Sequence, residues 1–208
     1  MKKIDLDNVY FHGIRPPYDE TGLTTSNELK ILQSILQQGA ILCREKQEQL
    51  GIKPILNDNL NRNGDDKVSI CCSRSDGFFN WVRNHISIIL PKDMPECSVE
   101  DRLFYGVDGE LQVKDFIPLK YFIGIGIPTG TSSFKQIVSE IKCCAQGSEE
   151  YFKAHLGNYC NRHITPVREI LNNTGYNISL YDIKTGELIQ TINELSGSIY
   201  HNNEELTL

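Results

Sequence analysis

The stretch Val-Tyr-Phe-His-Gly at residues 9–13 decides the fold that we expect for the N-terminal part of the chain. A short run of apolar and aromatic side chains is typical of a buried strand, which we predict over residues 8–12. The run ends with His12 and Gly13, and the prolines at residues 16 and 17 exclude a continuation of regular structure, because proline has a fixed φ and no backbone N–H. A histidine and a glycine therefore stand at the end of the first buried strand.

An amphipathic helix follows this strand. Leu29, Leu32, Ile35 and Leu36 recur at the spacing of one helix face, and Gly39 stands where a helix C-terminus favours glycine. Apolar runs bounded by turn residues predict further strands, and apolar residues at helical spacing predict further helices. We expect strands at residues 68–72, 86–90, 110–113 and 121–127, helices at residues 134–144 and 149–172, and an irregular segment at residues 93–107.

These elements predict an α+β fold. We expect a mainly antiparallel split sheet with flanking helices in the first 128 residues, followed by helices and a β-hairpin. Alternating apolar residues on both sides of Lys184-Thr185-Gly186 predict the hairpin. The 208 residues suffice for one domain with a substantial core. We therefore expect a core at residues 1–128 and an extension at residues 129–208 that packs on it.

Charge and hydropathy restrict the class of protein. Hydrophobic residues make up 39% of the chain and charged residues 23%, as in globular rather than disordered proteins. The net charge of −6 argues against sequence-independent binding to nucleic acid or to an anionic membrane, since both need a basic surface. No stretch has the roughly 18 apolar residues that span a bilayer, and residues 1–7 lack the apolar run of a signal peptide. We expect a cytoplasmic protein, or one exported without a conventional signal peptide.

The spacing of cysteine and histidine argues against a metal site. The seven cysteines include two adjacent pairs and no Cys-x-x-Cys motif, which indicates reduced thiols rather than a disulfide framework or a zinc site. The histidines beyond the first strand, at residues 85, 155, 163 and 201, show no metal-ligand spacing. We therefore expect no bound metal.

A carboxylate at the start of a later strand completes a recognisable order of motifs. The stretch Asp-Gly-Glu-Leu-Gln-Val at residues 108–113 places Glu110 there, and Val-Ser-Ile at residues 68–70 forms an intervening strand. The order of motifs is a His-Gly strand, a helix, a Val-Ser strand, and a Glu strand followed by Ile117-Pro118. In this order the motifs resemble those of the NAD-dependent ADP-ribosyltransferase superfamily, and of its bacterial mono-ADP-ribosyltransferases in particular. The resemblance covers residues 8–128 and rests on the ordered combination, since no single motif is specific.

The resemblance implies a site and a reaction. NAD would be the co-substrate, anchored by His12 and Gly13. Glu110 and His12 would be the catalytic residues, and Ser69 would support Glu110. Glu110 would stabilise the ribosyl cation that forms when the nicotinamide–ribose bond breaks. An aromatic side chain would stack on the nicotinamide ring, and the candidates are Phe78, Phe79 and Trp81.

Two positions depart from the pattern of that family. Cys71 and Cys72 stand where its members have Ser-Thr-Ser or a tyrosine. Asp108 stands two residues before Glu110, where several members carry Glu or Gln to orient the target, so modification of arginine is not implied. The implied function is mono-ADP-ribosylation of a macromolecular acceptor, as in a toxin or effector. The acidic charge favours a protein acceptor, although nucleic acid is not excluded.

Three other functions are compatible with the sequence. A Cys-dependent hydrolase or deamidase would combine a cysteine with a distant His and Asp, although no family-type motif surrounds a cysteine here. An ADP-ribosyltransferase fold that has lost catalysis would serve as a binding module. The same fold acting on 2′-phosphorylated RNA would need clustered Arg and His, which the acidic balance does not favour.

Overall fold

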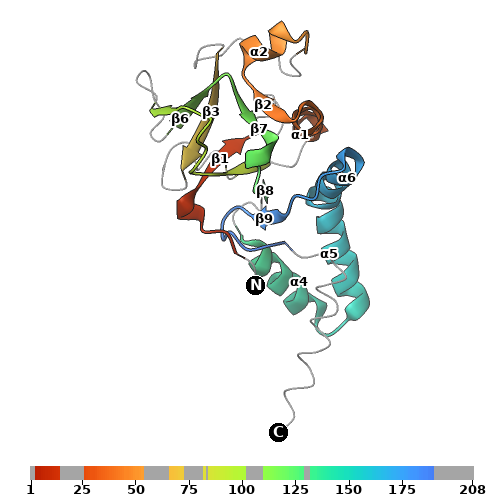
Figure 1. Ribbon diagram of the computed structural model, residues 1–208. Coiled ribbons are helices and arrows are strands. Elements are labelled where there is room, and N and C mark those ends of the chain that lie inside the picture. Colours follow the sequence, from red (N-terminus) through yellow and green to blue (C-terminus); the bar gives the residue numbers. More distant parts are fainter. Residues whose placement is uncertain are drawn as a thin grey trace.

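The structure of the protein, a computed structural model, describes residues 3–14, 26–53, 66–72, 82, 84–101, 110–128 and 132–189. Within these residues the fold is α+β. A mixed sheet of seven strands has the order β5–β6–β3–β1–β4–β8–β9, and β2 and β7 pair as a second sheet (Figure 1). The strands are β1 (Val9–Gly13), β2 (Ala40–Leu42), β3 (Lys67–Cys72), β4 (Ser87–Pro91), β5 (Val99–Asp101), β6 (Glu110–Lys114), β7 (Phe116–Pro118), β8 (Gly124–Ile127) and β9 (Leu180–Asp182).

The predicted sheet was mainly antiparallel, and the last strand makes the observed sheet mixed. The other described pairs of the large sheet are antiparallel, but β9 runs parallel to β8. A parallel neighbour requires a long crossover connection, and the chain between β8 and β9 supplies one that contains three helices. The sheet is therefore mixed, and the purely local patterns of the two strands carried no information on their relative direction.

Helices flank the sheet at both ends of the described chain. They are α1 (Ser26–Gln38), α2 (Arg44–Gln49), α4 (Phe134–Ala145), α5 (Glu149–His163) and α6 (Thr165–Thr174), with short 3-10 turns η1 (Leu6–Asn8) and η2 (Leu119–Tyr121). Gly39, with a φ of +70°, directly follows α1; the helix and its glycine terminator are confirmed. Residues 149–172 were predicted as one helix and form two, because Pro166 at the start of α6 has no N–H to continue α5.

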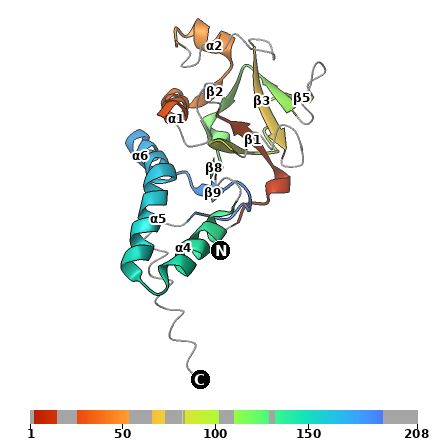
Figure 2. The same cartoon turned by 180° about the vertical axis from the view of Figure 1, so that it is seen from behind.

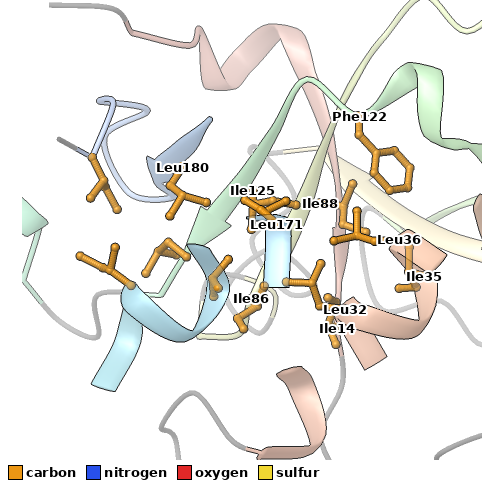
Figure 3. Packing of buried hydrophobic residues seen from close by; sticks show 14 of the residues in the cluster. Ile14, Leu32, Ile35, Leu36, Ile86, Ile88, Phe122, Ile125, Leu171 and Leu180 are labelled. Atoms are coloured by element: carbon orange, nitrogen blue, oxygen red, sulfur yellow. The ribbon is translucent and has the colours of Figure 1, made fainter. Parts of the chain in front are cut away.

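One hydrophobic cluster joins the parts of the chain before and after residue 128. Leu32 and Leu36 of α1, Ile88 of β4, Ile125 of β8 and Leu171 of α6 are buried in it (Figure 3). Helix α6 contacts α1, and both views of the ribbon show α4, α5 and α6 beside β9 (Figures 1 and 2). The C-terminal elements thus share this core and extend the sheet.

The opposite face of the sheet carries a second, smaller cluster. It contains Phe11 of β1, Cys71 of β3, Ile89 of β4 and Tyr181 of β9. Neighbouring residues of β4 enter different clusters, Ile88 one and Ile89 the other, because successive side chains of a strand point to opposite faces. Both faces of the central strands are covered, which explains their nearly continuous apolar sequence.

The C-terminal turn closes onto β9 and the start of α4. Gly186, at a φ of +72°, donates its N–H to Asp182 O over 2.8 Å, and Ile189 donates to Leu180 O over 2.8 Å. The carboxylate of Asp182 accepts the backbone N–H of Phe134, the first residue of α4, at 2.6 Å. A single buried side chain thereby links the turn to a helix.

Besides the two 3-10 turns, four short elements among the described residues were not predicted: β2, α2, β5 and β7. Residues 99–101, placed in an irregular segment by the sequence, form β5 at an edge of the sheet. Three residues are too few to show alternation, so only pairing with β6 identifies this strand. None of the described helices combines the length and the apolarity that crossing a membrane requires.

Candidate functional site

Three adjacent strands bring His12, Ser69 and Glu110 into a connected chain of contacts. The ring Nδ1 of His12 on β1 lies 2.9 Å from the backbone carbonyl oxygen of Ser69 on β3. The hydroxyl of the same serine donates to Oε1 of Glu110 on β6 over 2.6 Å. Residues separated by 57 and 41 positions in the sequence thus meet through one serine.

The strand register explains the contact between Ser69 and Glu110. In the ladder of β3 and β6, Cys71 lies opposite Glu110 and Ser69 lies opposite Gln112. Directly opposite residues share a face of the sheet, and so do residues two apart along a strand. Ser69 and Glu110 are therefore diagonal neighbours on one face, within reach of a hydrogen bond.

The end of β1 explains the contact made by His12. The register pairs β1 with β3 at Tyr10 and Phe11, whereas on its other side β1 remains paired with β4 as far as Gly13. Pairing between β1 and β3 therefore ends at Phe11. Just beyond it, the imidazole of His12 contacts the backbone carbonyl of Ser69. His12 and Gly13 therefore follow the last residue of β1 that pairs with β3.

The partner of His12 determines its tautomer and favours its neutral form. A carbonyl oxygen only accepts hydrogen bonds, so Nδ1 carries a proton and donates it, and in the neutral ring Nε2 keeps a lone pair. Burial lowers the pKa of His12 below its ordinary value, and the hydrogen bond to Ser69, which acts in the opposite direction, is the smaller effect. At neutral pH the ring can therefore accept a hydrogen bond from a ligand hydroxyl at Nε2.

Glu110 is a buried carboxyl group at the first residue of a strand. The residue is only 5% exposed, and a carboxylate in such a place must be hydrogen-bonded to be tolerated. Ser69 supplies one such bond and holds the orientation of the carboxyl group. Because electrostatic interactions are strong away from water, a carboxylate fixed in this way can stabilise a positive charge that develops on a substrate.

A further polar residue of this face was missed by the sequence reasoning. Gln112 is 7% exposed and lies directly opposite Ser69. The alternation of the strand contained the signal, because a residue two positions after Glu110 must share its face.

Several predicted site residues lie outside the described part of the chain. These are the aromatic candidates Phe78, Phe79 and Trp81, and also Asp108. Gly13 is described, and it pairs with Ser87 of β4. The structure therefore brings together His12, Ser69 and Glu110, with Gly13 adjacent to the first of them. Across the described ranges, no three His, Cys, Asp or Glu side chains are grouped so that they could hold a metal ion.

The environments of three thiols oppose nucleophilic chemistry by them. All seven cysteines are free. Burial raises the pKa of Cys43 and of Cys97, and it raises the pKa of Cys160 to about 11. The thiolate is the nucleophilic form, so these three side chains are protonated at neutral pH and behave as small apolar groups.

A second buried carboxyl group has a structural environment. Glu28 in the first turn of α1 is 1% exposed, and its Oε1 accepts the N–H of Ile86 at 3.2 Å and lies 3.3 Å from Nδ1 of His85. The contact fastens the start of α1 to the segment that enters β4. These two partners, a backbone group and a side chain, come from the same segment, as expected of a contact that joins two elements.

A surface depression lies at the other end of β6 from Glu110. It has a volume of about 240 Å³, and its lining residues are Glu96, Ser98, Lys114, Asp115, Phe116 and Pro118. Lys114 is the last residue of β6 and Glu110 is the first. The depression is therefore separate from the connected residues His12, Ser69 and Glu110. Comparison of the chain with protein-family models, curated proteins and solved structures finds no match.

Proposed function

We propose that the protein is an NAD-dependent mono-ADP-ribosyltransferase of a split-sheet, ADP-ribosyltransferase-like fold. The observation that carries the proposal is the hydrogen bond from Ser69 to the buried carboxyl group of Glu110, with His12 held by the same serine. These are the three residues to which the sequence resemblance assigns binding and catalysis. A resemblance in sequence does not by itself require these three distant residues to meet. Their contact in the fold is therefore support in addition to the resemblance.

The chemistry required by the reaction matches what these side chains offer. Cleavage of the nicotinamide–ribose bond passes through a ribose with oxocarbenium character, as glycoside hydrolysis does. The carboxylate of Glu110 stabilises that charge, and Ser69 keeps the carboxylate in place. The neutral ring of His12 accepts a hydrogen bond from a ribose hydroxyl at Nε2, and the backbone at Gly13 anchors the rest of NAD. A nucleophile of the acceptor then attacks the anomeric carbon.

The end of the pairing between β1 and β3 supports the proposed placement of NAD. The pairs between these strands stop at Phe11, one residue before the predicted anchor. A ligand bound there contacts His12 and Gly13 from one strand and Ser69 from the next. The acceptor is a macromolecule, and the formal charge of −6 favours a protein over a nucleic acid. A toxin or effector role follows from the bacterial proteins that the sequence resembles.

Release of nicotinamide from NAD tests the proposal. Wild type should release nicotinamide, Glu110→Gln should lose the release, and a lysate added as acceptor should stimulate wild type if transfer exceeds hydrolysis. Glu100→Gln is the matched control, because this carboxyl group lies on the neighbouring strand β5 with a side chain that is 58% exposed. Absence of both release and NAD binding by wild type would reject the proposal in favour of the binding module, and equal release by Glu110→Gln would reject the assigned role of the carboxylate.

A further inference from the structure

The backbone at the end of β1 is held from the side of β4. Pairing with β3 ends at Phe11, whereas pairing with β4 continues to Gly13, which lies opposite Ser87. Directly after the strand, Ile14 continues this contact and donates its N–H to the carbonyl oxygen of Ile86 over 2.8 Å. The backbone of the proposed NAD anchor is therefore placed by the residues that enter β4.

A buried carboxyl group fastens the entry of β4 to a helix. Glu28, in the first turn of α1, is 1% exposed. Its Oε1 accepts the N–H of Ile86 at 3.2 Å and lies 3.3 Å from Nδ1 of His85. Ile86 thus binds Glu28 through its N–H and Ile14 through its carbonyl oxygen. One residue links the start of α1 to the end of β1.

Apolar packing surrounds this pair of bonds. Ile14, Ile86 and Leu32 of α1 are buried in the larger hydrophobic cluster (Figure 3). Such packing keeps the two segments together but does not fix the direction of a peptide group, whereas a hydrogen bond does. Burial of a carboxyl group is itself destabilising. We expect a buried carboxyl group where the orientation of its partner matters for a binding site.

We propose that Glu28 is a positioning residue for NAD binding, an inference that rests on the proposed function. Through Ile86 and Ile14, it holds His12 and Gly13 in the place where they anchor the dinucleotide. Groups that bind a ligand need this support from the residues behind them, because small displacements lengthen and misalign the hydrogen bonds that they form. Glu28 acts on NAD only through the backbone that it holds.

The proposal predicts an effect on binding that is separate from catalysis. The bond between Ser69 and Glu110 joins β3 to β6 and does not pass through β4. Loss of the contact made by Glu28 should weaken binding of NAD equally in the ground state and in the transition state, which raises KM and leaves kcat nearly unchanged. In metal sites, loss of a group that orients a ligand lowers affinity about 10- to 100-fold. We expect an effect of about tenfold here.

Nicotinamide release measured over a range of NAD concentrations tests the contact in variants of Glu28. Glu28→Leu removes the acceptor of the Ile86 N–H, so KM should rise about tenfold. Glu28→Gln keeps an acceptor oxygen on a side chain of the same length, so its KM should stay close to that of wild type. Glu28→Asp places the carboxyl group on a shorter side chain and should also raise KM. It provides a second variant should the leucine disturb folding.

Asp182→Ala is the matched control that distinguishes positioning from a structural role. Asp182 is also 1% exposed and also accepts backbone N–H groups, those of Phe134 and Lys184. It lies on β9, and β4 and β8 separate that strand from β1. The control should lower the midpoint of thermal unfolding and leave KM unchanged. Hydrogen exchange at the amide of Ile14 should accelerate in Glu28→Leu and not in the control.

The possible failures can be told apart. If wild type cleaves NAD but folded Glu28→Leu and Glu28→Asp both keep its KM, the positioning role is wrong and the proposed function stands. If KM rises equally in Glu28→Leu and Asp182→Ala, the effect follows from lost stability and the positioning role is again wrong. If wild type neither binds nor cleaves NAD, both proposals are wrong.

Discussion

The ring of Tyr181 on β9 lies over Gly124 on β8, so closely that a Cβ added to the glycine would stand 2.7 Å from the ring. The two strands are parallel neighbours at the edge of the large sheet. The absence of a side chain at Gly124 therefore lets the buried tyrosine cover β8, and this packing attaches the C-terminal part of the chain to the rest.

Gly124→Ala should destabilise the protein. The added methyl group meets a buried aromatic ring instead of the flexible end of a side chain, and overpacking of this kind costs about 1–3 kcal/mol. Gly157→Ala is the matched control within α5, because nothing lies within 4 Å of its added Cβ. Alanine in a helix interior should stabilise by about 0.5–1 kcal/mol. Urea unfolding of both variants tests the pair, and equal effects would contradict it.

Ser69→Ala should reduce nicotinamide release while the protein stays folded. The substitution removes the hydroxyl that donates to Glu110 over 2.6 Å. A hydrogen bond to a charged group contributes about 1.5–3 kcal/mol, so the rate should fall roughly 10- to 100-fold. Ser69→Thr keeps the hydroxyl and suits a strand; it should retain most of the activity. A Ser69→Ala protein with the rate of wild type would show that the bond does not position the carboxylate.

Replacement of His12 should reduce the dependence of stability on pH. Burial lowers the pKa of His12 from its ordinary value of 6.5. Between the lowered pKa and 6.5 the unfolded chain binds more protons than the folded protein, so the free energy of unfolding rises with pH through this window and falls on acidification. His12→Gln removes this contribution, and urea unfolding on both sides of the window measures it. The pKa of His163 is also lowered by burial, so part of the dependence should remain. A slope identical to that of wild type would contradict the prediction.

Asp182→Ala should detach the C-terminal turn from α4. One carboxylate oxygen accepts the N–H of Phe134 at 2.6 Å, and the other accepts that of Lys184 at 2.8 Å. Leaving these two donors without partners costs about 1–3 kcal/mol each, so the free energy of unfolding should fall by about 2–6 kcal/mol. Asp182→Asn keeps one acceptor oxygen and should lose less. Hydrogen exchange should accelerate at the amides of Phe134 and Lys184 in the alanine variant. Unchanged protection of both would show that other contacts hold the turn.

Local structure followed from the sequence wherever a segment was long enough to show a period. The leucines of α1 and the glycine after it identified a helix and its end, and the apolar run at β4 identified a strand. The strand that begins at Glu110 was also placed correctly. Short elements such as β2 and β5, with three residues each, had no readable period and were missed.

The resemblance pointed to the residues of the candidate site and to one of its contacts, from Ser69 to Glu110, but not to the contact of His12 with Ser69. The order of motifs selected His12, Ser69 and Glu110, and the resemblance alone suggested that the serine supports the carboxylate. Gln112 was open to prediction from strand alternation, because it stands two residues after Glu110 and opposite Ser69. The catalytic and binding roles of His12, Ser69 and Glu110 remain predictions that the experiments above test.

The sequence by itself determined which segments become helices and strands, where several of them end, and which side chains alternate onto a common face, because these properties depend on neighbours a few residues away. Only the tertiary structure decided that β1 lies between β3 and β4, that β9 joins β8 in parallel, and that one serine contacts both His12 and Glu110. Strand neighbours and register are chosen by packing between distant segments, where many pairings satisfy the same local pattern. The geometry of the site is a consequence of that choice.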